Sequence, residues 1–152
     1  MNIAYAELTD FDAWLALARE VEYLFGPMAD EVPFQDALRQ AISQKTAFCI
    51  RADSDGRDQA LKGGIVISKE SNEIAWLAVS GKYRGKGYGR ELLKFAISNL
   101  NSKESIFVQT FDESSLEGKA ARKLYLDSGF TDNKNGGLNP AGFNTVIMQL
   151  AR

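Results

Sequence analysis

The sequence contains no histidine and only one cysteine, Cys49, among its 152 residues. Without histidine, Ser-His-Asp and Cys-His catalysis are excluded, and so are most zinc sites. A lone cysteine excludes an internal disulfide, and a reducing cytoplasm is the location we expect. Acid–base chemistry must therefore come from carboxylates, tyrosine, lysine, cysteine or water. Because Cys49 lies mid-strand with no histidine to activate it, we expect a buried structural thiol and not a nucleophile.

Long apolar runs are also missing. The longest, Ile74 to Val79, is far too short to cross a bilayer, and the first residues have neither the basic start nor the apolar run of a signal peptide. The net charge is −2, which gives no indication of bulk binding to nucleic acid. Length and an ordinary composition predict one domain over residues 1–152, with no nucleic acid and no membrane among its partners.

Apolar spacing alternates between the periods of strands and helices. Strands are expected over residues 3–8, 47–51, 61–68, 73–79, 105–111 and 143–150, with a short one from Phe130. Helices are expected from Asp10 as N-cap to Phe25, then around 34–42, 88–100 and 116–125. Turns are expected at 53–56, 135–137 and 139–140, and a break at Gly63-Gly64. Three consecutive strands followed by two strand–helix units predict an α/β (α+β) fold with a mixed sheet and helices on both faces.

The most informative segment is Arg84-Gly85-Lys86-Gly87-Tyr88-Gly89, which separates the strand at 73–79 from the helix at 88–100. Three glycines so close together disfavour both strand and helix. A turn that leaves its backbone N–H groups uncovered at a helix start explains them, because such groups and the helix dipole attract phosphate. Basic residues surround the turn, and we predict a ligand that carries a polyphosphate.

Two common phosphate loops fail on spacing. A dinucleotide fingerprint, G-x-G-x-x-G, would need glycine where Arg90 stands. A P-loop, G-x-x-x-x-G-K-[ST], would need one more residue after Gly81 and a Ser or Thr where Gly87 stands. What remains is R-x-x-G-x-G after a strand and before a helix.

Two segments carry a resemblance to a known family. The first is Leu77-Ala78-Val79, the glycine loop and Leu92-Leu93, and the second is Ala121-Arg122-Lys123-Leu124-Tyr125 ending at Ser128-Gly129-Phe130. With both in this order, the sequence resembles the GNAT superfamily of acyl-CoA-dependent N-acetyltransferases. The resemblance is strongest from about Ile65 to Phe130. It implies a mixed, mostly antiparallel central sheet. It also implies transfer of an acetyl group from acetyl-CoA to a primary amine by direct attack, with acetyl-CoA as cosubstrate and no metal.

The resemblance also implies site residues. Tyr125 takes the position of the tyrosine that protonates the departing thiolate, and Glu73 stands where some members place a general base. The N–H of Val79 is the expected oxyanion donor. The positions implied for binding acetyl-CoA are Leu77, Ala78, Val79, Arg84, Gly85, Lys86, Gly87, Tyr88 and Gly89. Many members have an asparagine where this chain has Gly118, so the contact made there to CoA is absent or is replaced by the backbone or Lys119.

Several alternatives stay open. Glu73 is a base or an ordinary surface glutamate, with water, Asp30, Glu31, Asp112 or Glu113 as other candidates. The acceptor is a small amine or a protein amine. A non-catalytic acyl-CoA-binding regulatory module on the same fold is the main alternative, and a nucleotide-binding protein is a weaker one. The chain is expected to be a monomer or a homodimer, since the apolar final strand could pair across a dimer.

Overall fold

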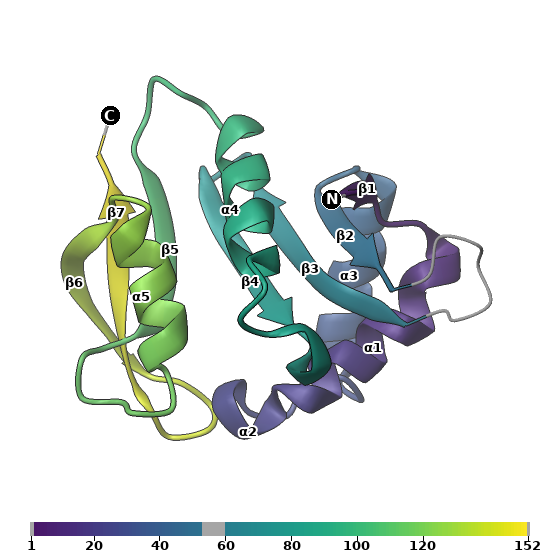
Figure 1. Ribbon diagram of the computed structural model, residues 1–152, viewed down its shortest axis with the longest axis horizontal. Coiled ribbons are helices and arrows are strands. Elements are labelled where there is room, and N and C mark those ends of the chain that lie inside the picture. Colours follow the sequence, from purple (N-terminus) through teal and green to yellow (C-terminus); the bar gives the residue numbers. More distant parts are fainter. Residues whose placement is uncertain (1, 53–59, 152) are drawn as a thin grey trace.

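The computed structural model describes residues 2–52 and 60–151, and in this part of the chain seven strands form one sheet of order β1-β2-β3-β4-β5-β7-β6 (Figure 1). The strands are β1 (Ala4–Tyr5), β2 (Ala47–Arg51), β3 (Leu61–Ser68), β4 (Glu73–Val79), β5 (Ile106–Phe111), β6 (Thr131–Leu138) and β7 (Asn144–Leu150). Among these described strands only β4 and β5 pair in parallel, and the other neighbours are antiparallel. The predicted mixed, mostly antiparallel sheet is confirmed.

Helices cover both faces of this sheet, as predicted (Figure 1). They are α1 (Phe11–Glu20), α2 (Glu22–Phe25), α3 (Val32–Ser43), α4 (Tyr88–Ser98) and α5 (Lys119–Asp127), with 3-10 turns η1 (Leu8–Asp10) and η2 (Gly81–Tyr83). The predicted turn at 53–56 lies outside the described residues. No helix in the described ranges is long and apolar enough to cross a bilayer.

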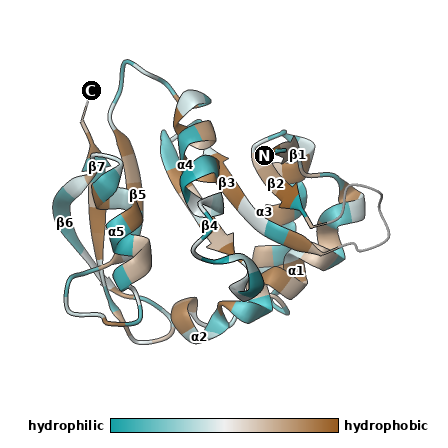
Figure 2. Ribbon diagram, in the orientation of Figure 1, coloured by the Kyte–Doolittle hydropathy of each residue, from teal (hydrophilic) through white to brown (hydrophobic). Residues whose placement is uncertain are grey.

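The alternation of side chains along β2 explains the two layers. Phe48 and Ile50 belong to a core shared with α4 and α5, while Ala47 and Cys49 belong to a second core shared with α1 and α3. Successive strand residues point to opposite faces, so a strand buried on both sides reads as a continuous apolar run. Figure 2 shows this apolar character along the central strands.

The two glycines of β3 do not break the strand, which corrects our expectation. Gly63 pairs with Val79 and Gly64 with Ala78 in a continuous ladder. A Cβ added to Gly64 would lie 2.7 Å from the ring of Trp14, which is fully buried. The glycine is therefore needed for close approach of helix α1 to the sheet, and not for a turn.

The predicted first helix is two helices, because the chain leaves helical geometry at Val21 (φ −109°, ψ 7°) before α2 begins. Asp10 holds the N-cap position of α1 but makes no capping hydrogen bond. Its carboxylate instead accepts hydrogen bonds from Arg51 at 2.9 and 2.7 Å and from the N–H of Glu7 at 2.8 Å. Asp10 therefore joins η1 to β2. As predicted, the helical segment ends at Gly26, whose φ is +96°.

Three further expectations need correction. The 135–137 segment is no turn: β6 continues through it with irregular register, because β7 supplies a partner on that edge. Strand β7 lies between β5 and β6, so both its edges are occupied within the chain and it cannot pair across a dimer. Leu116 precedes α5 and is 82% exposed, so it does not belong to the buried stripe of that helix.

Candidate active site

The glycine loop runs from η2 to the start of α4 and has an unusual backbone. Gly85 and Gly87 have φ of +76° and +88°, a conformation that side-chain-bearing residues rarely adopt, and a Cβ on either would meet nothing within 4 Å. Gly87 is the N-cap of α4, with no side chain capping the helix. Within the described residues, no backbone N–H from Arg84 to Arg90 has an acceptor. The loop therefore presents a row of free donors at the positive end of a helix.

A basic and aromatic cluster stands beside this loop. Lys62, on β3, donates a hydrogen bond from Nζ to the hydroxyl of Tyr88 at 3.0 Å. The same ammonium lies 4.9 Å from the ring centre of Tyr88 and 5.4 Å from that of Tyr83, and Lys86 lies 5.8 Å from the Tyr83 ring. The sequence pattern missed Lys62, because nothing in a strand lysine indicates that pairing of β3 with β4 brings it to the loop.

Arg84 ties the loop to its surroundings. Its Nε donates to the carbonyl of Val79 at 3.3 Å, and its guanidinium donates to the hydroxyl of Tyr23 at 3.4 Å. The side chain therefore bridges the end of β4 and helix α2. The guanidinium contributes positive charge near the loop, while the N–H groups remain the directional donors.

Strands β4 and β5 part soon after they meet. Their parallel pairing consists of Glu73 with Phe107 and Ile74 with Val108, and the rest of β4 pairs only with β3. On the other edge, the N–H of Ser80 donates to the carbonyl of Lys62 at 2.8 Å. Since backbone groups alternate along a strand, the backbone groups of Val79 and Leu77 point toward the gap. The carbonyl of Val79 already accepts from Arg84, so the N–H of Val79 and both groups of Leu77 form the open edge. An extended ligand with amides can bond to this open edge.

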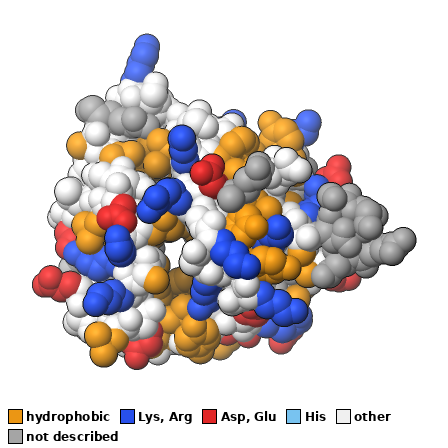
Figure 3. Space-filling model, viewed as in Figure 1, with side chains coloured by type: hydrophobic (Ala, Val, Ile, Leu, Met, Phe, Trp, Pro, Cys, Tyr) orange, Lys and Arg blue, Asp and Glu red, His pale blue; other side chains and the backbone are white. Residues whose placement is uncertain are grey.

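A cavity of about 880 Å³ lies between the diverging strands β4 and β5 and extends to the glycine loop. Its walls come from β4 between Ile74 and Val79, β5 between Val108 and Phe111, the loop with the start of α4, α5, α2, and the turn between β6 and β7. Figure 3 shows the molecule hollowed between α4 and α5, with basic side chains around the hollow and apolar ones at its α2 end. Every position predicted to bind acetyl-CoA lines this cavity except Lys86.

Tyr125, on α5, lies where β4 and β5 diverge. It lines the cavity, is only 5% exposed, and shares a buried cluster with Ile74 and Val108, the last parallel pair. Its ring meets Phe130 edge-on, with centroids 5.6 Å apart. Its hydroxyl has no hydrogen-bond partner among the described residues. Burial raises the pKa of this phenol well above its usual value, so it keeps its proton at neutral pH.

The structure does not bring Glu73 to the cavity wall. It is the first residue of β4, opposite Ser68 and Phe107, and it is not among the lining residues, whereas the next residue, Ile74, is. The lining carboxylates are Glu117 and Asp127, and Asp127 is paired with Lys123 at 2.7 Å.

The other predicted acids also lie off the wall. Asp30, Glu31, Asp112 and Glu113 do not line the cavity. Asp30 is held by Arg19 at 2.9 Å.

Gly118 has a steric explanation. It is the N-cap of α5, and a Cβ there would lie 2.1 Å from the ring of Phe111. No asparagine side chain fits unless Phe111 moves. Lys119 does not line the cavity, so the aromatic ring of Phe111 occupies this corner instead.

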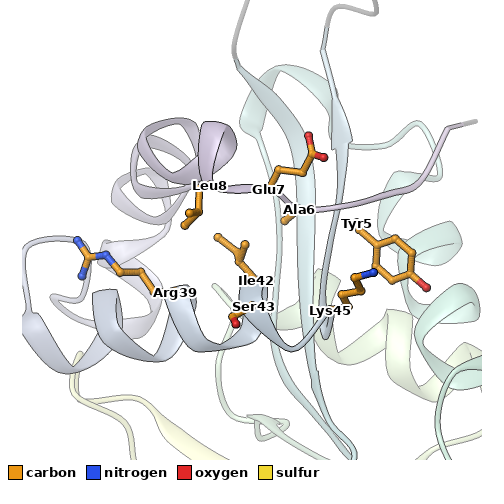
Figure 4. A pocket seen from close by; sticks show the side chains of 8 residues that line it. All are labelled: Tyr5, Ala6, Glu7, Leu8, Arg39, Ile42, Ser43 and Lys45. Atoms are coloured by element: carbon orange, nitrogen blue, oxygen red, sulfur yellow. The ribbon is translucent and has the colours of Figure 1, made fainter.

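Two features lie apart from the cavity. A smaller hollow of about 420 Å³ between η1 and α3 has Arg39 and Lys45 at opposite ends (Figure 4). Both are engaged, Arg39 with Asp36 and Lys45 over the Tyr5 ring. Cys49 is fully buried in β2, and burial raises the pKa of its thiol to about 12, as expected for a structural thiol. Nowhere in residues 2–52 and 60–151 do three or more metal-ligating side chains gather to hold an ion.

The geometry defines a class of protein. Its sheet opens between two parallel strands to receive an extended ligand, and the phosphates of that ligand would meet a bare helix N-terminus. Residues 25–152 match the family model described as "Acetyltransferase (GNAT) domain". The chain therefore belongs to the GNAT family of acetyltransferases.

Solved structures share this fold. A GNAT-family acetyltransferase from Bacillus cereus ATCC 10987 is 16% identical with a TM-score of 0.74, over 99% of this chain and 96% of that one. The yncA protein of Salmonella typhimurium, solved with its cofactor acetyl-CoA, is 17% identical with a TM-score of 0.69, over 99% and 93%. The ribosomal-protein-S18-alanine N-acetyltransferase of Escherichia coli is 18% identical with a TM-score of 0.70, over 99% and 92%. A comparison with curated protein sequences gives no match.

Proposed function

We propose that this protein, acting as a single domain, transfers the acetyl group of acetyl-CoA to a primary amine by direct attack. One observation carries the proposal. The free N–H groups from Arg84 to Arg90 directly follow a strand whose edge is open on the same side. Pyrophosphate suits the first feature and the amides of a pantetheine arm suit the second, and coenzyme A has both.

In this proposal the pyrophosphate binds the loop N–H groups, and Gly85 and Gly87 let the backbone take the shape that directs them. The pantetheine arm extends along Leu77 to Val79 toward the point where β4 and β5 meet. Lys62 and Lys86 add positive charge beside the loop. Exposed lysines are screened individually, so the backbone donors provide the specificity.

The proposed reaction proceeds through one tetrahedral intermediate. A base takes a proton from the ammonium, and the amine nitrogen attacks the thioester carbon. The N–H of Val79, or that of Leu77 on the same edge, donates to the resulting oxyanion, an interaction that can be worth ~3 kcal/mol. The base releases this first proton to solvent. The C–S bond then breaks, Tyr125 gives its proton to the sulfur, and the second proton of the nitrogen passes to the freed base. Solvent restores the proton of Tyr125.

This mechanism has two versions, which differ in the group that acts as the base. Glu73 lies one residue before the lining residue Ile74, so its carboxylate would act through water that enters at the start of β4. Alternatively, water alone carries the proton away. Glu73→Gln separates them: a fall in kcat/KM of about 100-fold assigns the base to Glu73, whereas an unchanged pH profile assigns it to water.

The position of Glu73 off the cavity wall also favours a second candidate, a module that binds acyl-CoA without catalysis. The two functions differ in one assay. Purified protein is titrated calorimetrically with acetyl-CoA, with ATP and NAD as competitors, and release of CoA thiol is followed with a panel of amines. The enzyme binds acetyl-CoA and releases thiol only when an amine is present. Tight binding without turnover on any amine would support the module, and displacement of CoA by ATP or NAD would support a nucleotide site.

A further inference from the structure

A further wall of the cavity adjoins the glycine loop at Arg84, which donates to the hydroxyl of Tyr23. It is built by α2 and by the turn between β6 and β7, and its residues are Tyr23, Leu24, Phe25, Leu138, Asn139 and Pro140. The two segments are fastened together: Asn139 donates from Nδ2 to the carbonyl of Leu24 at 2.8 Å. Phe25 also stacks on Phe111 of β5, with ring centres 5.6 Å apart. This wall is therefore fixed by contacts and ready to receive a ligand.

No residue of this wall carries a charge. The acids nearest to α2 in sequence are engaged elsewhere: Glu20 accepts from Ser80 and the N–H of Gly81 at 3.1 Å, and Glu22 accepts the N–H groups of Met28 and Ala29 at 2.7 and 3.0 Å. Asp30 pairs with Arg19. The Arg84 guanidinium reaches the wall, where it donates to the hydroxyl of Tyr23.

The two lining carboxylates lie at opposite ends of α5. Asp127 ends that helix, whereas Glu117 comes just before its N-cap, Gly118, which packs on Phe111, the ring that stacks on Phe25. Asp127 is neutralised by Lys123. The wall of α2 and the β6–β7 turn is itself apolar, with the Arg84 guanidinium at Tyr23 and Glu117 near Phe111 as the charged groups beside it.

We infer that the acceptor is a primary amine that bears an apolar group of the size of a phenyl or leucyl side chain. This inference rests on the proposed function and names its substrate class. The apolar group packs between Phe25 of α2 and Leu138 of the turn, and the nitrogen points toward the thioester. Both a small arylalkylamine and a peptide whose first residue is apolar present this chemistry.

The test compares primary amines that carry an apolar group with primary amines that do not. 2-Phenylethylamine, ethanolamine and spermidine are assayed by thiol release and by the mass of the acetylated product, beside two peptides that begin with Leu or Asp. Loss of an apolar group from a fitted pocket typically lowers kcat/KM by 10–200-fold, so we expect about 100-fold preference for 2-phenylethylamine over ethanolamine and over spermidine. The rates with 2-phenylethylamine and with the Leu peptide are then compared. The faster of the two shows whether the acceptor is a small amine or the N-terminus of a peptide.

A charge placed on the wall provides the second arm. Leu138 is 68% exposed, so Leu138→Glu should leave the fold intact. It should lower kcat/KM for the apolar amine about tenfold, raise it for spermidine, and leave the affinity for acetyl-CoA unchanged. Leu116→Glu is the matched control, because Leu116 is also exposed, at 82%, and lies outside the cavity. This variant should show wild-type selectivity.

The outcomes separate the two claims. Turnover of spermidine or ethanolamine at least as efficient as that of the apolar amines would overturn the substrate class and leave the acetyltransferase proposal standing. Equal selectivity in Leu138→Glu and Leu116→Glu would show that this wall does not bind the acceptor. Binding of acetyl-CoA with no product from any amine or peptide would overturn the proposed function itself, and the substrate class with it.

Discussion

Replacing Tyr125 with phenylalanine removes one hydroxyl from the point where β4 and β5 diverge. The hydroxyl has no partner in the described part of the chain, so its loss leaves no donor or acceptor unpaired, and the free energy of unfolding should change by less than about 0.5 kcal/mol. The ring keeps its contact with Phe130. Catalysis should suffer far more, because general acid catalysis is worth ~10²–10⁴-fold. We expect kcat to fall about 100-fold, equivalent to about 2.7 kcal/mol, with little change in affinity for acetyl-CoA.

The assay is thiol release at saturating acetyl-CoA, with thermal unfolding measured on the same samples. Tyr5→Phe is the matched control, because Tyr5 lies on β1, away from the cavity, and is half exposed. Since burial raises the pKa of Tyr125, the wild-type enzyme should not lose activity through deprotonation of this group below about pH 10. A Tyr125→Phe enzyme with kcat within about threefold of wild type would refute the role of the phenol as acid.

Three further changes test the loop and the framework. Gly87→Ala forces a side chain into φ +88° at a cost of about 1–2 kcal/mol without any clash, and should raise the KM for acetyl-CoA more than it lowers kcat. Lys62→Met should raise the same KM about tenfold while leaving kcat near wild type, because it removes a charge beside the loop and no reacting group. Burial alone would raise the pKa of Asp10, but Arg51 and the N–H of Glu7 hold it below its ordinary value, so the stability it contributes is present above about pH 4 and is lost as pH falls further. Asp10→Asn should therefore lower the unfolding free energy by about 2 kcal/mol at pH 7, and by progressively less toward pH 2 in chemical denaturation.

Much of the fold was predictable because its elements carry local signals. The strand at 47–51, the strand at 61–68 and the helix that ends at Gly26 follow from apolar runs and from a residue that adopts positive φ. Misassignments occurred where a distant contact overrides the local signal. Gly64 lies inside a strand because Trp14 needs the space. Asp10 does hold the predicted N-cap position of α1, but its carboxylate binds Arg51 of β2 and the N–H of Glu7 instead of the first turn of that helix.

The candidate site also has parts that local sequence predicts and parts that it does not. The glycine loop and the β4 sequence are contiguous, so spacing indicates a phosphate loop after a strand. The neutral wall of α2 and the β6–β7 turn joins residues that are far apart in sequence, such as Leu24 and Asn139, and no local pattern reports their contact. Lys62 was missed for the same reason. The acids near α2 were natural candidates from sequence, yet side-chain direction decides whether a carboxylate faces a cavity, and spacing in a loop does not reveal it.

The most direct test of the account is an amide-resolved NMR titration of the protein with acetyl-CoA. The account predicts that the N–H resonances of Gly85, Gly87 and Gly89 move downfield as they gain a phosphate acceptor, together with that of Val79 on the open edge of β4. 3′-Dephospho-CoA, which keeps the pyrophosphate, should reproduce the loop shifts. Saturable binding that leaves these amides unmoved while others shift would contradict the assignment of the glycine loop as the site that holds acetyl-CoA.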